Sequence, residues 1–201
     1  MTKADGSHAQ TRYLRETFIA AALAAIAVGA AAEPAAYAID PGHTVVTFEA
    51  LHLNTSTQRG RMQAKEGSVV LDRAAKSGKA DITIDLTTLS AASSSLEGTL
   101  KGERVFNVAQ GPTARFVGDT FTFDGDKVAS VAGTLTILGK SQPVTLKAIR
   151  FNCYENAQLK REVCGGDFGA TIQRSQYGIG FLPNVTPDSI PLLIQVEAIR
   201  Q

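Results

Sequence analysis

The chain has 201 residues, of which 44% are hydrophobic and 19% charged, so it can bury a core and does not have a disordered composition. Its 20 Lys and Arg residues are balanced by 19 Asp and Glu residues. Without a basic run in the body of the chain, binding to nucleic acid or to a membrane through a polybasic patch is not expected. The length fits a single domain behind an N-terminal head.

Residues 1–32 have the pattern of a secretory signal peptide. Arg12 and Arg15 precede an apolar run over residues 18–32, which ends in small residues. We expect cleavage after Ala32, with Ala36 as a second candidate. A permanent anchor is the alternative, but the run is short of the ~20 residues that span a bilayer. These features predict export to the periplasm and a mature domain over residues 33–201.

The mature chain alternates between apolar and polar residues with a period of two, which is typical of half-buried β-strands. In the first run Val46, Phe48, Ala50 and His52 share one face. Later runs repeat the pattern. Their apolar faces carry Ile82, Ile84, Leu86, Leu135, Ile137, Val144, Leu146, Ala148, Phe168, Ala170, Ile172, Ile190, Leu192, Ile194, Val196 and Ala198.

Turn signals separate these runs at residues 40–42, 65–67, 77–79, 124–126 and 138–140. Many short strands joined by tight turns indicate an all-β barrel or sandwich. One interruption, over residues 93–105, has apolar residues at near-helical spacing behind a run of Ser residues that can cap a helix. It predicts a short helix across one end of the sheet structure.

Cys153 and Cys164 are the two cysteines of the chain, and in an exported protein such a pair predicts a disulfide. Their spacing fits neither a redox Cys-x-x-Cys motif nor a zinc set, and the mature chain has only His43 and His52. We therefore expect no metal site.

The sequence has no nucleophile elbow, P-loop or Gly-x-Gly-x-x-Gly fingerprint, so no catalytic centre is predicted. His52 shares a face with Phe48, which makes it either a structural histidine or a polar group at the mouth of a cavity. Arg174 continues the apolar face of the run that ends at Ile172, where an unpaired charge is costly. It is either paired with a carboxylate or carbonyl, or it clamps the headgroup of a ligand.

Several segments, in order along the chain, resemble the YceI-like family of exported bacterial lipid-binding barrels. They are residues 37–44 (Tyr-Ala-Ile-Asp-Pro-Gly-His-Thr) followed by Phe48 and His52, and residues 100–101, 106–109, 112–116, 133–139, 143–144 and 174–178. The resemblance implies a lipocalin-like antiparallel β-barrel of about eight strands. It also implies an apolar lumen for a polyisoprenoid or other long-chain lipid. The resemblance establishes no catalysis, and we expect neither enzyme activity nor a cofactor beyond that ligand.

From this resemblance and the strand pattern we predict a lipid-binding tunnel with a polar mouth. Its wall is predicted to contain Phe48, Ile84, Phe116, Ile137, Phe168, Ile172 and Ile194, and its mouth Arg174 and His52. Two rival hypotheses are a filled-core interaction module of an envelope complex and a lipid-modifying enzyme that uses His52. The protein is expected as a monomer or homodimer, with transient contact to a membrane or membrane protein.

Overall fold

The structure, a computed structural model, describes residues 33–201; the signal peptide predicted for residues 1–32 lies outside this part. The described chain is mostly β-strand, with one α-helix and one 3-10 helix. In chain order the elements are β1 (Ala35–Ile39), β2 (Val45–His52), β3 (Ser56–Asp72), β4 (Ser77–Ala91), α1 (Ser94–Lys101), β5 (Thr113–Asp124), β6 (Lys127–Ile137), β7 (Lys140–Asn156), β8 (Arg161–Gln173), η1 (Arg174–Tyr177) and β9 (Ser189–Arg200).

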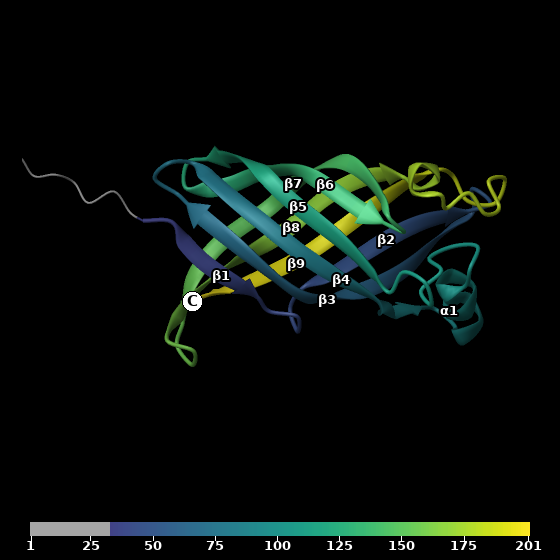
Figure 1. Cartoon of the computed structure of the whole chain (residues 1–201), viewed down its shortest axis with the longest axis horizontal. Helices are drawn as coiled ribbons and strands as arrows, with labels where there is room; N and C mark the ends of the chain where they lie inside the picture. The colour runs from purple at the N-terminus through teal and green to yellow at the C-terminus, as the bar shows by residue number, and fades with distance from the viewer. Residues whose placement is uncertain (1–32) are drawn as a thin grey trace, which may run out of the picture. The chain divides into compact units, whose positions relative to one another are not determined.

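The strands form one antiparallel sheet that closes into a barrel (Figure 1). Consecutive strands pair from β3 to β9, and β1 and β2 together bridge β9 back to β3. β2 pairs with residues 56–63 of β3, whereas β1 pairs with residues 68–71, so the two short strands fill one position in series. The barrel therefore has eight strand positions, which confirms the predicted fold class.

The prediction of a turn at residues 65–67 is wrong, because β3 runs through these residues as one 17-residue strand. The pairing of β3 with β4 shifts register between Ala64 and Glu66, as at a β-bulge. Residue types that favour turns, such as Gly67, also occur at bulges, because a strand bends there. At this bend the neighbour of β3 changes from β2 to β1. The next turn lies at residues 73–76 rather than 77–79, whereas the tight turns expected near residues 40–42, 124–126 and 138–140 are present.

The predicted helix is present but shorter than expected. The Ser93 hydroxyl accepts a hydrogen bond from the Leu96 N–H and caps α1, as the run of Ser residues indicated. α1 ends at Lys101 with Gly102 as its C-cap, and the chain folds back so that the Phe106 N–H donates to the Leu100 carbonyl at 3.0 Å. Gly102 has extended backbone, with φ of −69° and ψ of 168°, so the helix does not continue through it.

The two ends of the barrel differ. At one end, here called the mouth, lie the β2–β3 turn, α1 with residues 102–112, and the long connection of residues 178–188 that follows η1 (Figure 1). At the other, here called the closed end, lie β1 and the C-terminus. No helix within residues 33–201 is long and apolar enough to cross a membrane.

Candidate functional site

A cavity of about 390 Å³ lies inside the barrel, and side chains from all nine strands line it. All nine side chains predicted from the sequence lie on its wall: Phe48, His52, Ile84, Phe116, Ile137, Phe168, Ile172, Arg174 and Ile194. Most other lining residues are aliphatic or aromatic, and none is Asp or Glu. The volume falls in the range of ordinary small-molecule sites.

The strand alternation explains why these side chains converge. Successive side chains of a strand point to opposite faces, so every second residue points inward in a closed barrel. Residues directly opposite each other on neighbouring strands point to the same side of the sheet. Phe168 on β8 and Ile194 on β9 are such a pair, and both line the cavity. The apolar faces read from the sequence thus supply most of the strand residues of the cavity wall, although Ala148 and Ala170 do not line it.

Phe48 on β2 has a glycine as its cross-strand partner. Gly60 lies directly opposite Phe48, and a Cβ atom at Gly60 would fall 2.3 Å from the Phe48 ring. The ring therefore occupies the space that a side chain at residue 60 would take. Phe48 also lies opposite Leu192 of β9, and the ring centroid of Phe106 is 5.9 Å from that of Phe48. Gly60 and Phe106 together fix where Phe48 sits in the wall.

The strand pattern did not find the lining residues that come from the connections at the mouth. Leu96, Leu100 and Val105 lie in or just after α1, and their near-helical spacing was the available signal. Phe106 and Phe181 have no periodic signal, because they lie in irregular segments. The irregular segments that follow α1 and η1 thus complete the wall at the mouth.

Arg174 is 8% exposed and anchors the connection that follows η1. Its Nε donates to the Pro187 carbonyl at 3.0 Å, and Nη1 donates to the carbonyls of Ile179 and Phe181 at 2.9 and 2.8 Å. Nη2 donates to the Thr186 carbonyl at 2.7 Å. Four of the five guanidinium N–H groups are therefore used within the protein, which leaves one for a ligand.

His52 ends β2 at the mouth, where its side chain is exposed. Gln58 and Arg59 of β3 also belong to the cavity wall there. Arg59 Nε donates to Glu49 Oε1 at 2.7 Å, so this arginine is held in a surface ion pair. Within residues 33–201, no Asp or Glu side chain lines the cavity beside His52.

A polar cluster lies at the closed end. The Tyr37 hydroxyl donates to Glu162 Oε1 at 2.5 Å, Arg73 Nη2 donates to Glu162 Oε2 at 2.8 Å, and Arg200 lies 3.9 Å from Oε1. Burial raises the pKa of Glu162, but the Tyr37 and Arg73 hydrogen bonds and the two guanidinium charges outweigh it and lower the pKa. Burial, followed by the bond to Glu162, raises the pKa of Tyr37 to about 12.

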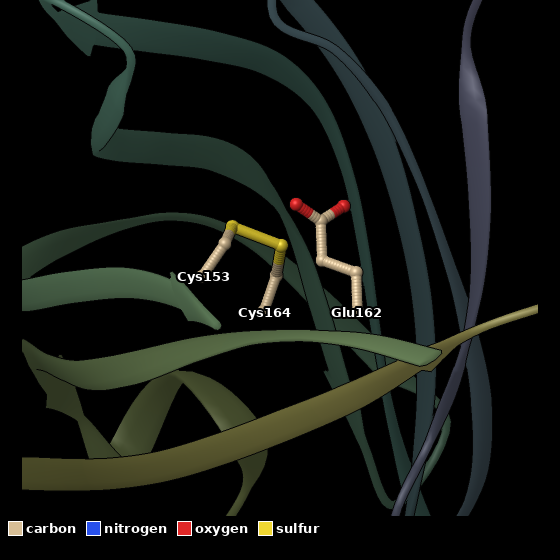
Figure 2. Close-up of side chains that lie close together, drawn as sticks. All are labelled: Cys153, Glu162 and Cys164. Atoms are coloured by element: carbon tan, nitrogen blue, oxygen red, sulfur yellow. A yellow bond between two sulfur atoms is a disulfide. The ribbon is translucent and has the colours of Figure 1, made fainter. Parts of the chain in front are cut away.

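Cys153 and Cys164 form a disulfide between directly opposed residues of β7 and β8, as predicted. Cys164 is 3% exposed and lies on the cavity wall near the closed end. Figure 2 shows the Glu162 carboxylate beside this bond, and the three groups lie within 4.8 Å of one another. The sulfur atoms are bonded to each other, so neither is a thiolate available to bind a metal.

Comparisons with known proteins agree with this fold. Residues 37–198 match the YceI-like domain. A UPF0312 protein of Pseudomonas putida is 32% identical over 193 residues, covering 94% of this chain and 99% of the relative. A UPF0312 protein of Pseudomonas aeruginosa is 30% identical over 188 residues, covering 89% and 97%.

Two solved structures share the fold at low sequence identity. Burkholderia cenocepacia BcnA has a TM-score of 0.63 and 21% identity, over 79% of this chain and 98% of that one. A polyisoprenoid binding domain from Saccharophagus degradans has a TM-score of 0.56 and 14% identity, over 83% and 99%. The domain match, the full-length relatives and the closed barrel around an apolar cavity agree, and the chain belongs to the YceI-like family.

Proposed function

We propose that this protein is a periplasmic carrier that holds a polyisoprenoid or another long-chain lipid in the barrel cavity, and that it is not an enzyme. The observation that carries the proposal is the apolar cavity of about 390 Å³, to which every strand contributes. The Saccharophagus degradans domain named for polyisoprenoid binding supports it through the shared fold. The ligand is the lipid itself, and the proposal needs no cofactor.

Burial of an aliphatic tail supplies enough free energy for such binding. Each methylene removed from water contributes about 0.8 kcal/mol, so ten of them contribute roughly 8 kcal/mol before the costs of association. The seven apolar residues predicted for the tunnel would contact this tail: Phe48, Ile84, Phe116, Ile137, Phe168, Ile172 and Ile194. Affinity would therefore come from the tail and specificity from the mouth.

The polar end of the lipid is proposed to lie at the mouth, beside His52 and Arg174. His52 is exposed there, and Gln58 adds an amide to the same part of the wall. Arg174 has one N–H left after its four bonds to carbonyls, so it would donate a single hydrogen bond rather than a bidentate pair. This arrangement favours a headgroup that accepts hydrogen bonds over one that needs several charges neutralised.

The experiment is native mass spectrometry of the protein purified from the periplasm, followed by extraction and identification of the released lipid. We expect one prenyl or long-chain lipid per chain. Ile194→Trp, which fills the cavity, should emerge empty. Leu193→Trp is the matched control, because Leu193 is the neighbouring residue of β9 and is 42% exposed. If the wild-type protein emerged empty and refused added polyprenyl lipid, the carrier proposal would fail and a protein partner would be sought.

A further inference from the structure

We propose that the mouth of the barrel docks on a lipid bilayer by inserting exposed leucine side chains, so that lipid passes directly between membrane and cavity. The proposal rests on the carrier function. It concerns a surface formed by Leu51 and Leu53 at the β2–β3 turn and Leu182 in the connection after η1, here called the leucine rim.

The leucine rim places large apolar side chains in solvent at one end of the barrel. Leu53 is 57% exposed, Leu182 is 48% exposed and Leu51 is 37% exposed. Single exposed leucines are common on soluble proteins, but several around one opening indicate an interaction surface. A flexible terminus does not explain them, since Leu51 belongs to β2 and Leu53 begins the following turn.

The backbone holds this rim in a defined shape. The Leu53 N–H donates to the Val185 carbonyl at 2.9 Å, and the Val185 N–H donates to the Leu182 carbonyl at 3.0 Å. These bonds join the two connections, and Arg174 anchors the second of them. Leu53 and Leu182 both have φ of 49°, in the left-handed region that glycine and asparagine tolerate best. Leucine therefore stands at two rim positions whose backbone conformation favours other residues.

The leucine rim is continuous with the cavity, which indicates its partner. Leu182 and Val185 belong both to the connection that forms the rim and to the cavity wall. A surface that covers the rim therefore also covers the opening, and an apolar ligand could cross without entering water. A bilayer supplies both an apolar layer for the leucines and the lipid to be exchanged.

Charges near the rim suit a shallow position at the headgroup layer. Arg104 is exposed and its guanidinium lies 4.2 Å from the Phe181 ring centroid, beside the opening. It could meet lipid phosphates while the ring contacts acyl chains. The body of the chain has no basic run, so docking would depend on apolar insertion more than on charge.

Tryptophan fluorescence gives a direct test, because the natural chain contains no Trp. Leu53→Trp places a single reporter in the rim. Leu159→Trp is the matched control, since Leu159 is 47% exposed but lies in the β7–β8 turn. With vesicles of phosphatidylcholine we expect a blue shift of the Leu53→Trp emission and its quenching by brominated lipid, and neither effect for Leu159→Trp. Equal responses of the two reporters would overturn the proposal.

A transfer assay separates docking from lipid binding. Leu53→Ser should slow transfer of a fluorescent polyprenyl lipid from vesicles about tenfold, because it removes apolar area from the rim. Its binding of the same lipid from detergent solution should stay within about twofold of wild type, because Leu53 is outside the cavity wall. Transfer by Leu53→Ser at the wild-type rate would exclude docking through the leucine rim. If transfer by the wild-type protein required a protein acceptor, the rim would be assigned to that protein and not to the bilayer. Failure of the wild-type protein to bind lipid from detergent would instead overturn the carrier function.

Discussion

Arg174 is a charged residue whose burial is explained by its neighbours rather than by an ion pair. Its four hydrogen bonds to backbone carbonyls satisfy the guanidinium and hold residues 178–188 at the mouth. Of the two sequence hypotheses, pairing with carbonyls describes what the structure contains, and contact with a headgroup stays a prediction. The residue thus shapes the opening whether or not it touches lipid.

Arg174→Met should destabilise the fold by about 3 kcal/mol, because it leaves several carbonyls without donors. Arg174→Lys should recover only part of this loss, since an ammonium cannot reach all four acceptors in the same geometry. Urea denaturation measures both effects. Arg150→Met is the control, because the Arg150 side chain is 78% exposed and its pair with Asp167 lies on the surface. Equal losses in the two Met variants would refute the anchoring role.

Gly60 makes room for the Phe48 ring, so a larger residue there should narrow the cavity. We expect Gly60→Val to push the ring inward and to weaken lipid binding about tenfold, together with a stability loss of roughly 1–3 kcal/mol from overpacking. Adding Phe48→Leu to the Gly60→Val variant should restore part of the lipid affinity and part of the stability. Gly98→Ala is the control, because a Cβ there meets no atom within 4 Å. Lipid affinity is measured by calorimetric titration. Wild-type affinity in Gly60→Val would contradict the role given to Gly60.

At the scale of elements, the disulfide ties β7 to β8 next to the cavity wall. It joins residues 11 apart in sequence, and closing a loop of that size stabilises by roughly 3 kcal/mol in the chain-entropy model. Cys153→Ala with Cys164→Ala should therefore lose about this amount in chemical denaturation. A reducing agent should destabilise the wild-type protein similarly and leave the double variant unchanged. A double variant as stable as the oxidised wild type would contradict this expectation.

The Glu162 cluster joins β8 to β1 through Tyr37, to the β3–β4 turn through Arg73 and to β9 through Arg200. In the folded state the pKa of the Glu162 carboxyl is lowered from the ordinary 4.5. The stability that the ionised Glu162 carboxylate contributes is therefore present above about pH 4.5. That contribution is lost as pH falls through the lowered pKa. We expect Glu162→Gln to be roughly 1–2 kcal/mol less stable than wild type at pH 7, with the difference shrinking as the solution is acidified.

Urea denaturation from pH 7 down to strong acid measures the free energy of unfolding of Glu162→Gln and of the wild-type protein, and so checks this prediction. Glu103→Gln serves as the control, because Glu103 is exposed and lies in the connection after α1. It should follow the wild-type curve at every pH. A constant difference between Glu162→Gln and wild type down to strong acid would show that the ionised carboxylate is not the source of the stability.

At the scale of the whole molecule, the pairings of β3 with β4 and of β1 with β9 close the sheet into a ring. The closure is not complete along every strand, because residues 148–156 of β7 pair with β8 but not with β6. The two ends of the barrel differ, because one contains the Glu162 cluster and the other contains the cavity-lining connections that follow α1 and η1. Lipid would therefore enter and leave at the mouth.

A lipid in the cavity should stabilise the whole barrel, because all nine strands line that cavity and a ligand there would contact many of them. Free lipid at 100 times the dissociation constant stabilises the folded state by about 2.7 kcal/mol, which corresponds to a rise in Tm of roughly 5 to 10 °C for a domain of this size. Differential scanning fluorimetry with added polyprenyl lipid measures this rise. Leu193→Trp should retain it and Ile194→Trp should lose it, and equal shifts in both would place the ligand outside the cavity.

The sequence alone determined the features that depend on neighbouring residues. Alternation identified the inward faces of β2, β4, β6, β7, β8 and β9, and all nine predicted site residues lie on the cavity wall. The inward residues of β3, among them Met62 and Leu71, were not identified from the sequence. The Ser run located the start of α1, and the two cysteines paired as expected. These signals are local, since side-chain direction in a strand and capping in a helix depend on residues a few positions apart.

Only the tertiary structure decided what depends on distant segments meeting. Residues 65–67 form a bulge and not a turn, because the partner of β3 changes there. Tyr37 and Glu162 are 125 residues apart, and the carbonyls that hold Arg174 lie in an irregular connection. No periodic pattern encodes such contacts. Closure of the barrel brings the segments together, and burial then favours the arrangement that pairs their polar groups.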